Sequence, residues 1–267
     1  MAPITSPTEE LLVEQADHIL TITLNRPDRL NAISGPMLNA LSSTLQAANI
    51  DPDVRVVVLT GAGRGFCAGL DLKDQASGDG LGATRGYRLF DLHNSPPIVI
   101  NRMDKPLICA LNGAAAGYGM DLALGCDIRI ASEHAKMGAV FAKRGVLPES
   151  GGCWYLPRLL GWARAAEVAF LGDVLDARRS LELGLVNRVV PHDDLMAESM
   201  KIARQIANNA PLSVQSTKRM MRLGQDETFE AAVDHIYLQL LPLFQSEDFK
   251  EGLSAFAERR EPVFKGR

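Results

Sequence analysis

The feature that most constrains the fold is a repeated phrase, in which a short apolar strand leads into a glycine-containing turn. Residues 54–61, VRVVVLTG, form a nearly continuous run of β-branched and apolar residues, typical of a strand buried on both faces. The phrase recurs at residues 106–113 and 127–133, and residues 185–191 close the series. A helical segment is expected after each turn, and after the third phrase it falls in residues 136–145. The repeat therefore predicts an α/β core.

The two ends of the chain differ from this repeat. In residues 11–25, β-branched and apolar residues surround a polar break, which predicts a β-hairpin. A helix is expected after residues 35–36, because apolar residues then recur at helical spacing. From residue 193 onward the whole pattern is helical and amphipathic, with helices expected over residues 195–208, 211–223, 228–240 and 249–259. We therefore expect a core over residues 1–192 and a helical segment over residues 193–267 that packs against another subunit.

Composition narrows the possible partners and compartments. The 267 residues carry a net charge of −4 and no block of Lys or Arg, which argues against nucleic-acid binding. No apolar run approaches the length of a membrane span, and the first residues lack an export signal, so we expect a cytoplasmic protein without a membrane partner. The four cysteines and five histidines show no metal-type spacing, so no metal site is expected. Residues 78–86 are rich in glycine and polar residues, which predicts a surface loop.

Two glycine-rich turns are the candidate functional segments. The first is GAGRGFCAGLDL, residues 61–72. A dinucleotide fingerprint would need a third glycine where Phe66 stands, so this turn does not fit that motif. No Gly-Lys-Ser/Thr of a phosphate-binding loop occurs in the chain, and Ser150 in LPESGG lacks the glycine pattern of a hydrolase nucleophile.

The second turn, NGAAAGYGMDLALG, covers residues 112–125 and opens a helix. A ligand oxygen placed there would meet free N–H groups and the positive end of the helix dipole. The alternative interpretation is that the small residues only let a helix pack tightly. Taken alone, this turn does not decide between the two.

Together, the two turns and four further segments resemble the crotonase (enoyl-CoA hydratase/isomerase) superfamily over nearly the whole chain. The matching segments keep the family's order and are LNRPDRLNAI (24–33), VVVLTGAGRGFCAGLDL (56–72), KPLICALNG (105–113), CDIRIASEHAKMG (126–138), SLELGLVNRVVP (180–191) and AFAERREPVFKGR (255–267). The resemblance implies a spiral of ββα turns with a C-terminal helical segment that completes a homotrimer, or a homohexamer built from two trimers. It implies an acyl-CoA thioester as the partner, with CoA entering as part of the substrate and no separate cofactor.

The resemblance also assigns roles to residues of the two turns. The backbone N–H groups of Ala68 and Tyr118 would bind the thioester oxygen and stabilise the enolate. Residues 68–71, namely Ala68, Gly69, Leu70 and Asp71, would border the CoA moiety. By the same analogy Lys265 would approach the CoA phosphates from a neighbouring subunit, and Arg29 and Lys73 are weaker candidates.

The carboxylates distinguish the possible reactions. Family hydratases use two glutamates around one water, and the matching positions here hold Asp121 and Phe141. Glu149, in the Pro-Glu of the stretch AVFAKRGVLPESGGCWYLPRLLG, resembles the catalytic acid of the branch that shifts double bonds. One carboxylate that reaches both the α and the γ carbon can act as base and then as acid. Phe141 and Trp154 would belong to the acyl pocket and raise the pKa of Glu149.

Three hypotheses follow. The favoured one is an enoyl-CoA isomerase that uses Glu149, with Asp121 as a second candidate for a chemical role. The second is a hydratase, or another lyase or hydrolase of the same fold, in which Asp121 or Glu149 activates water. The third is an acyl-CoA-binding protein without turnover.

Overall fold

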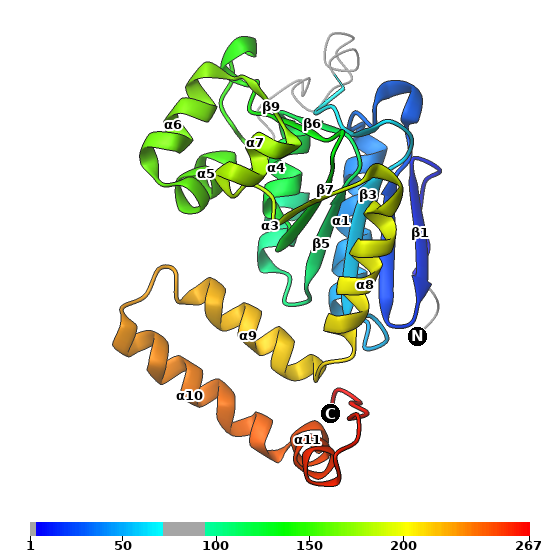
Figure 1. Ribbon diagram of the computed structural model, residues 1–267, viewed down its shortest axis with the longest axis vertical. Coiled ribbons are helices and arrows are strands. Elements are labelled where there is room, and N and C mark those ends of the chain that lie inside the picture. Colours follow the sequence, from blue (N-terminus) through cyan, green and yellow to red (C-terminus); the bar gives the residue numbers. More distant parts are fainter. Residues whose placement is uncertain (1–3, 72–93) are drawn as a thin grey trace.

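The computed structural model describes residues 4–71 and 94–267. Its main sheet has six strands in the order β1-β2-β3-β5-β7-β10 (Figure 1). β1 and β2 form the expected antiparallel hairpin, and the remaining neighbours pair in parallel. The strands are β1 (Leu11–Ala16), β2 (Ile19–Leu24), β3 (Val56–Gly61), β5 (Leu107–Leu111), β7 (Ile128–Ser132) and β10 (Arg188–Val190).

A second sheet has four strands in the order β4-β6-β8-β9. Each of β3, β5 and β7 runs directly into a short strand of this sheet, which produces the expected spiral of ββα turns. The strands are β4 (Gly65–Cys67), β6 (Ala114–Ala116), β8 (Lys136–Gly138) and β9 (Val174–Asp176). The expected helix over residues 136–145 is wrong, because β8 occupies its first part and pairs with both β6 and β9.

Helices cover both faces of the main sheet. In β3, Val57 and Leu59 belong to the core that includes α1 (Gly35–Ile50), whereas Val56 and Val58 face α8 (Leu195–Ala207). Successive side chains of a strand point to opposite faces, so an uninterrupted apolar run is what a strand covered on both sides needs. Figure 1 shows α8 in front of the sheet and α1 behind it.

The remaining helices follow the strands in chain order. They are α3 (Pro96–Arg102), α4 (Tyr118–Gly125), α5 (Gly152–Leu160), α6 (Trp162–Leu171), α7 (Ala177–Leu183), α9 (Pro211–Leu223), α10 (Phe229–Gln245) and α11 (Glu247–Glu258), with 3-10 turns η1 (Pro27–Arg29), η3 (Ala142–Arg144) and η4 (His192–Asp194). None of the helices described is long and apolar enough to cross a membrane.

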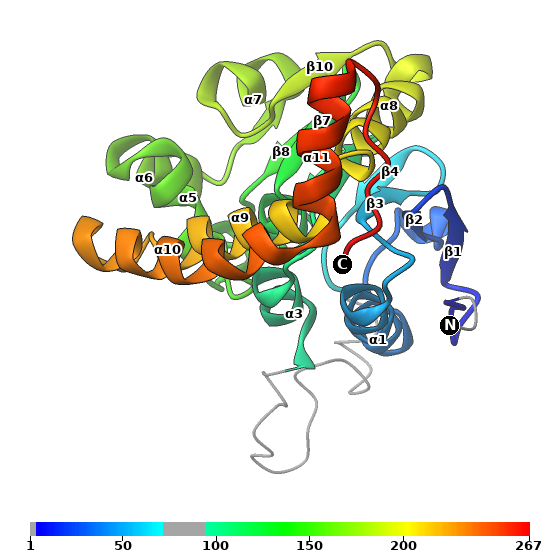
Figure 2. The same cartoon turned by 90° about the horizontal axis from the view of Figure 1, so that it is seen from below.

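The C-terminal helices α9 to α11 lie beyond the sheets, with α9 and α10 side by side (Figure 1), and α10 lies in front of α9 when the molecule is seen from below (Figure 2). None of the residues of α10 is buried. The division into residues 1–192 and 193–267 stays a prediction. Within the second part, α8 packs on the sheet, and α9 to α11 extend from it.

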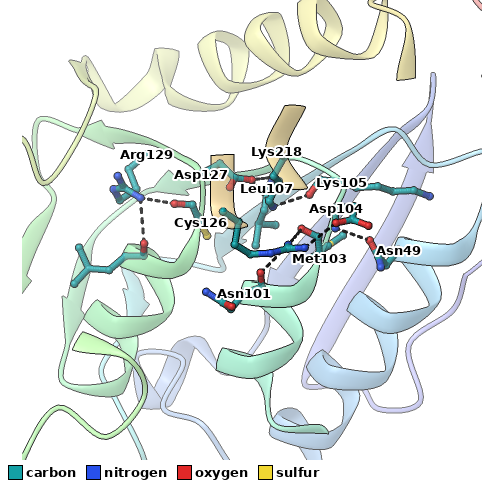
Figure 3. Close-up of polar contacts among 12 residues, drawn as sticks. Asn49, Asn101, Met103, Asp104, Lys105, Leu107, Cys126, Asp127, Arg129 and Lys218 are labelled. Atoms are coloured by element: carbon teal, nitrogen blue, oxygen red, sulfur yellow. Dashed lines mark hydrogen bonds and ion pairs between the residues drawn. The ribbon is translucent and has the colours of Figure 1, made fainter. Parts of the chain in front are cut away.

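A cluster of ion pairs fastens α9 to the segments that lead into β5 and β7 (Figure 3). Asp104 accepts hydrogen bonds from both Arg219 and Arg222, the latter at 3.0 Å. Lys218 binds Asp127 at 2.7 Å and donates to the carbonyl of Lys105 at 2.9 Å. Burial acts to raise the pKa of Asp104, but the hydrogen bonds from the two arginines outweigh it and leave that pKa lowered.

Candidate active site

The first glycine-rich turn is held by a buried asparagine from the LNRPDRLNAI segment. The Asn31 side chain donates to the carbonyls of Ala62 at 2.9 Å and Gly65 at 2.7 Å, and its oxygen accepts from the N–H of Arg26. Arg26 in turn lies 3.1 Å from the buried carboxylate of Asp71. These contacts fix both ends of the turn, because a buried amide side chain is stable only when its polar atoms are paired.

The second turn is tied to the first by Asn112. Its oxygen accepts from the N–H of Gly61 at 3.1 Å, and its nitrogen donates to the carbonyls of Gly63 and Gly65. After β6 the chain bends at Gly117, whose φ is +53°, and α4 begins at Tyr118. The two turns are therefore joined by hydrogen bonds from one side chain.

The turns approach each other closely at Gly69. A Cβ atom at this position would lie 3.0 Å from the carbonyl oxygen of Ala116 and 3.7 Å from the backbone nitrogen of Tyr118. The φ of Gly69 is +107°, a conformation that side-chain-bearing residues rarely adopt. A glycine here allows the backbone of the first turn to lie beside the N-terminus of α4.

The amide of Ala68 is not free to bind a ligand, so the prediction that it is an oxyanion donor is corrected. Its N–H donates to the carbonyl of Leu30 at 3.0 Å. Leu70 forms a parallel bridge with Ile33, in which the N–H of Ile33 and the N–H of Asp71 make the ladder bonds. Backbone groups alternate in direction along a strand, so the N–H of Leu70 points away from this ladder. In the described part of the chain, neither Leu70 nor Tyr118 has an acceptor for its N–H.

A cavity of about 1670 Å³ opens beside these two amides. Its lining is mainly apolar and aromatic, and it includes Leu38 of α1, Leu70, Tyr118 and Trp154. Arg222 of α9 also lines it, so the ion-pair cluster described above helps to shape the cavity. The Tyr118 hydroxyl is buried and has no hydrogen-bond partner among residues 4–71 and 94–267. Burial first, and then the nearby acids and Cys67, raise the pKa of this phenol.

Glu149 lies on the wall of this cavity, in the loop between η3 and α5. Partial burial raises the pKa of its carboxyl, while its own amide and the Ser150 hydroxyl act in the opposite direction. A raised pKa brings a carboxylic acid closer to the value at which it exchanges protons efficiently near neutrality.

Asp121 lies beneath this loop. Its side chain is 1% exposed, and Oδ2 accepts the N–H of Ser150 at 3.1 Å. It is not among the described residues that line the cavity. Burial raises the pKa of Asp121 to about 7, the charge of Glu149 adds to this rise, and the amides of Gly152 and Ser150 oppose it.

This arrangement can be compared with known proteins. The enoyl-CoA hydratase/isomerase family profile matches residues 14–267. The chain belongs to the enoyl-CoA hydratase/isomerase family. It is 38% identical over 252 residues to 1,2-epoxyphenylacetyl-CoA isomerase of Escherichia coli K12, covering 93% of this chain and 95% of the relative.

Two further matches agree. The chain is 38% identical over 256 residues to (E)-benzylidenesuccinyl-CoA hydratase of Thauera aromatica, covering 95% of this chain and 98% of the relative. Its fold matches the crystal structure of enoyl-CoA hydratase from Mycobacterium tuberculosis H37Rv with a TM-score of 0.88 and 36% identity, covering 97% of this chain and 100% of that one. The crotonase resemblance and fold are thus confirmed, and the relatives' names include both reactions.

The two predicted pocket aromatics lie differently in this family member. Trp154 lines the cavity, and the guanidinium of Arg158 sits 3.9 Å from the centre of its ring. Phe141 is 4% exposed, belongs to the core and lies near Gly117, and it does not appear in the described lining. The interpretation of Phe141 as a pocket wall is therefore corrected to a residue that supports the turn from behind.

The predicted CoA-binding residues are spread over the molecule. Leu70 lies on the cavity wall, Gly69 packs beside Tyr118, and the Asp71 carboxylate pairs with Arg26. Arg29 is exposed on η1, and Lys265 is exposed in the C-terminal tail, where its N–H binds Asp248 at 2.6 Å. A role for these residues in CoA binding stays a prediction, and Lys73 and the loop at 78–86 lie outside the described residues.

Proposed function

We propose that this protein is an acyl-CoA double-bond isomerase in which the amides of Leu70 and Tyr118 hold the thioester oxygen and Glu149 moves the proton. The observation that supports it most is the placement of the two acids. Glu149 shares a cavity wall with Tyr118 and Leu70, whereas Asp121 is enclosed beneath the loop. Of these two acids only Glu149 lines the cavity, and one accessible carboxylate suits proton transfer between two carbons better than it suits water addition.

The oxyanion role rests on where charge develops. Removing a proton from the α carbon of a thioester places negative charge on its carbonyl oxygen. Two fixed N–H donors, one of them at the N-terminus of α4, would stabilise that charge as it forms. In enzymes with preorganised oxyanion donors, the loss of one such donor typically costs about 3–4 kcal/mol of barrier.

Glu149 would carry the proton between the two carbons. As the carboxylate it takes a proton from the α carbon, and the electron pair moves into the enolate. As the acid it returns a proton to the γ carbon, and the double bond then lies next to the carbonyl. The raised pKa of Glu149 supports both halves, because the group must accept and release a proton at the same pH.

Hydration is the competing proposal, and the hydratase names among the relatives favour it. Two-acid hydration needs a second carboxylate beside the attacking water. The second position holds Phe141, which can neither activate water nor protonate carbon. Asp121 would have to reach a water from beneath Ser150, where its side chain is enclosed.

We further propose that CoA is bound only as part of the substrate and that the active assembly is a homotrimer or a dimer of trimers. The C-terminal helices favour assembly, because they leave large apolar side chains exposed to solvent. Phe229 is 80% exposed, Leu238 66% and Phe256 86%. Apolar patches of this kind mark association surfaces more often than free surface.

The test incubates the purified protein with 3-enoyl-CoA and, separately, with 2-enoyl-CoA, and scores isomer formation and water addition by mass spectrometry. We expect the 3-enoyl substrate to be converted without added water, and Glu149→Gln to lower kcat by about 10²–10⁴-fold. Hydration of the 2-enoyl substrate, or full activity in Glu149→Gln, would refute the isomerase proposal. Tight binding of both substrates with no turnover would support a binding protein instead.

A further inference from the structure

The turn that carries Glu149 is built around the side chain of Asp121. Oδ2 of Asp121 accepts the N–H of Ser150, the residue directly after Glu149, in a buried hydrogen bond of 3.1 Å. A Cβ atom at Gly152 would lie 2.3 Å from Oδ1 of Asp121 and 2.7 Å from Cβ of Pro148. Gly152 therefore leaves the space that the carboxylate fills, and the chain passes around it from Pro148 to Gly152.

We propose that Asp121 is the positioning residue for Glu149: its carboxylate anchors the 148–152 turn from below and so keeps Glu149 on the cavity wall. This inference rests on the proposed function, in which Glu149 moves the proton. Asp121 itself does not line the cavity in which the substrate would react. It acts through the backbone of the turn and through the charge that it places under Glu149.

Burial and chain geometry exclude simpler roles for Asp121. A helix-capping role would require Asp121 to precede its helix, but it is the fourth residue of α4, and its own N–H bonds to Gly117. No cation pairs with it among the described residues. Among the same residues, Oδ1 has no hydrogen-bond partner. The carboxylate therefore does not serve a structural ion pair. The groups that its carboxylate does meet, the amides of Ser150 and Gly152, belong to the turn.

The charge of Asp121 links the anchor to pH. The titratable groups that face it are Glu149 from the turn, Cys153 from α5 and Tyr118 from its own helix, which also adjoins Cys67 of β4. An ionised carboxylate accepts an amide N–H more strongly than a protonated one. When Asp121 ionises, near pH 7, the turn is held more tightly, and the repulsion between the two carboxylates makes Glu149 a stronger base.

The experiment compares two substitutions that separate shape from charge. Asp121→Ala removes both the anchor and the charge, whereas Asp121→Asn keeps an oxygen that can accept the Ser150 amide. With 3-enoyl-CoA as the probe, we expect Asp121→Ala to lower kcat by about tenfold to a hundredfold with little change in KM, because Glu149 is misplaced. We expect the wild type to show an inflection near pH 7 in kcat/KM, and Asp121→Asn to restore most of kcat but to lack this inflection.

Two results would overturn the proposal. Wild-type kcat and an unchanged pH profile in both variants would mean that Asp121 does not act on Glu149. Loss of activity in Asp121→Asn equal to that in Glu149→Gln would make Asp121 a reacting acid instead of an anchor.

A second measurement does not depend on turnover, and it separates this proposal from the proposed function. Amide hydrogen exchange of the peptide that contains Ser150 is followed in wild type and Asp121→Asn, without substrate, at pH values on both sides of 7. We expect faster exchange relative to distant peptides in the variant, and in wild type as the pH falls. Identical protection in both proteins refutes the anchor even if Glu149→Gln is inactive. Changed protection with an active Glu149→Gln supports the anchor and refutes the isomerase proposal.

Discussion

Replacing Asp121 by Asn should stabilise this protein at neutral and alkaline pH, although it removes the carboxylate that we propose positions Glu149. The carboxyl of Asp121 has an ordinary pKa of 3.8 and a folded-state pKa raised to about 7, mainly because burial disfavours the charged form. Between these two values the folded protein holds a proton that the unfolded chain has released. Stability therefore falls as the pH rises from about 4 to about 7, and it levels off above that.

The size of the effect follows from the same two values. The difference between 3.8 and about 7, at 1.36 kcal/mol per pKa unit, corresponds to about 4 kcal/mol of stability lost at alkaline pH. Asn has nearly the same shape and no charge, so the variant escapes this loss. At about pH 4 both side chains are neutral, and the two proteins should be similarly stable.

The assay is urea unfolding of wild type and Asp121→Asn at one fixed protein concentration, at several pH values between about 4 and about 8.5. Subtracting the two curves cancels the other titrating groups, such as Asp104. We expect the advantage of the variant to grow from near zero to a few kcal/mol. A difference that is independent of pH would refute the reasoning, since Asp121 would then not titrate in the folded protein near neutrality.

Three further predictions concern the amides, the ion cluster and the outward-facing helices. Leu70→Pro removes the N–H and should lower kcat by about 10²–10³-fold, whereas Leu70→Ala keeps the amide and should lose much less; equal losses would argue against Leu70 as a donor. Asp104→Asn should lower the free energy of unfolding by about 1–3 kcal/mol, because Arg219 and Arg222 lose the carboxylate that they bind. An unchanged midpoint in urea titrations would show that the ion-pair cluster does not contribute to stability. In light scattering, Phe256→Asp should shift the protein from the proposed trimer or hexamer towards monomers, and an unchanged mass would exclude that face as the contact.

Much of the core was predictable because its signals are local. The uninterrupted apolar run that became β3 predicts burial on both faces, and α1 and α8 indeed cover those faces. The helical periodicity after residue 193 gave α8, α9 and α11 with ends close to those observed. These elements are fixed by their own side-chain patterns, so a single sequence is enough to predict them.

The second sheet was harder to predict because its strands depend on distant partners. β8 has only three residues, Lys136–Gly138, within a stretch where the strand–turn–helix repeat predicts a helix. Its partners are β6, about one turn of the spiral earlier, and β9, which begins at Val174. Pairing across such distances outweighs local propensity.

The site shows the same limit at the level of single atoms. The sequence identifies the turn that carries Ala68 and Leu70, but it does not show which of their two N–H groups is free to bind a ligand. That depends on the contacts of this turn with Leu30 and Ile33, in which the N–H of Ala68 is used and that of Leu70 is not. Likewise, nothing in the sequence indicates that Asp121 lies under Ser150, because that hydrogen bond joins residues 29 positions apart.

In the proposed reaction one carboxylate, Glu149, takes the proton from the α carbon and returns it at the γ carbon. The most direct test uses 3-enoyl-CoA with deuterium at the α carbon, incubated in ordinary water, and locates the label in the product by mass spectrometry. We expect a 2-enoyl product that retains part of the deuterium at the γ carbon, and its formation at a rate lowered by about 10²–10⁴-fold in Glu149→Gln. A product that has gained a water molecule, or the same labelled isomer formed by Glu149→Gln at the wild-type rate, would contradict it.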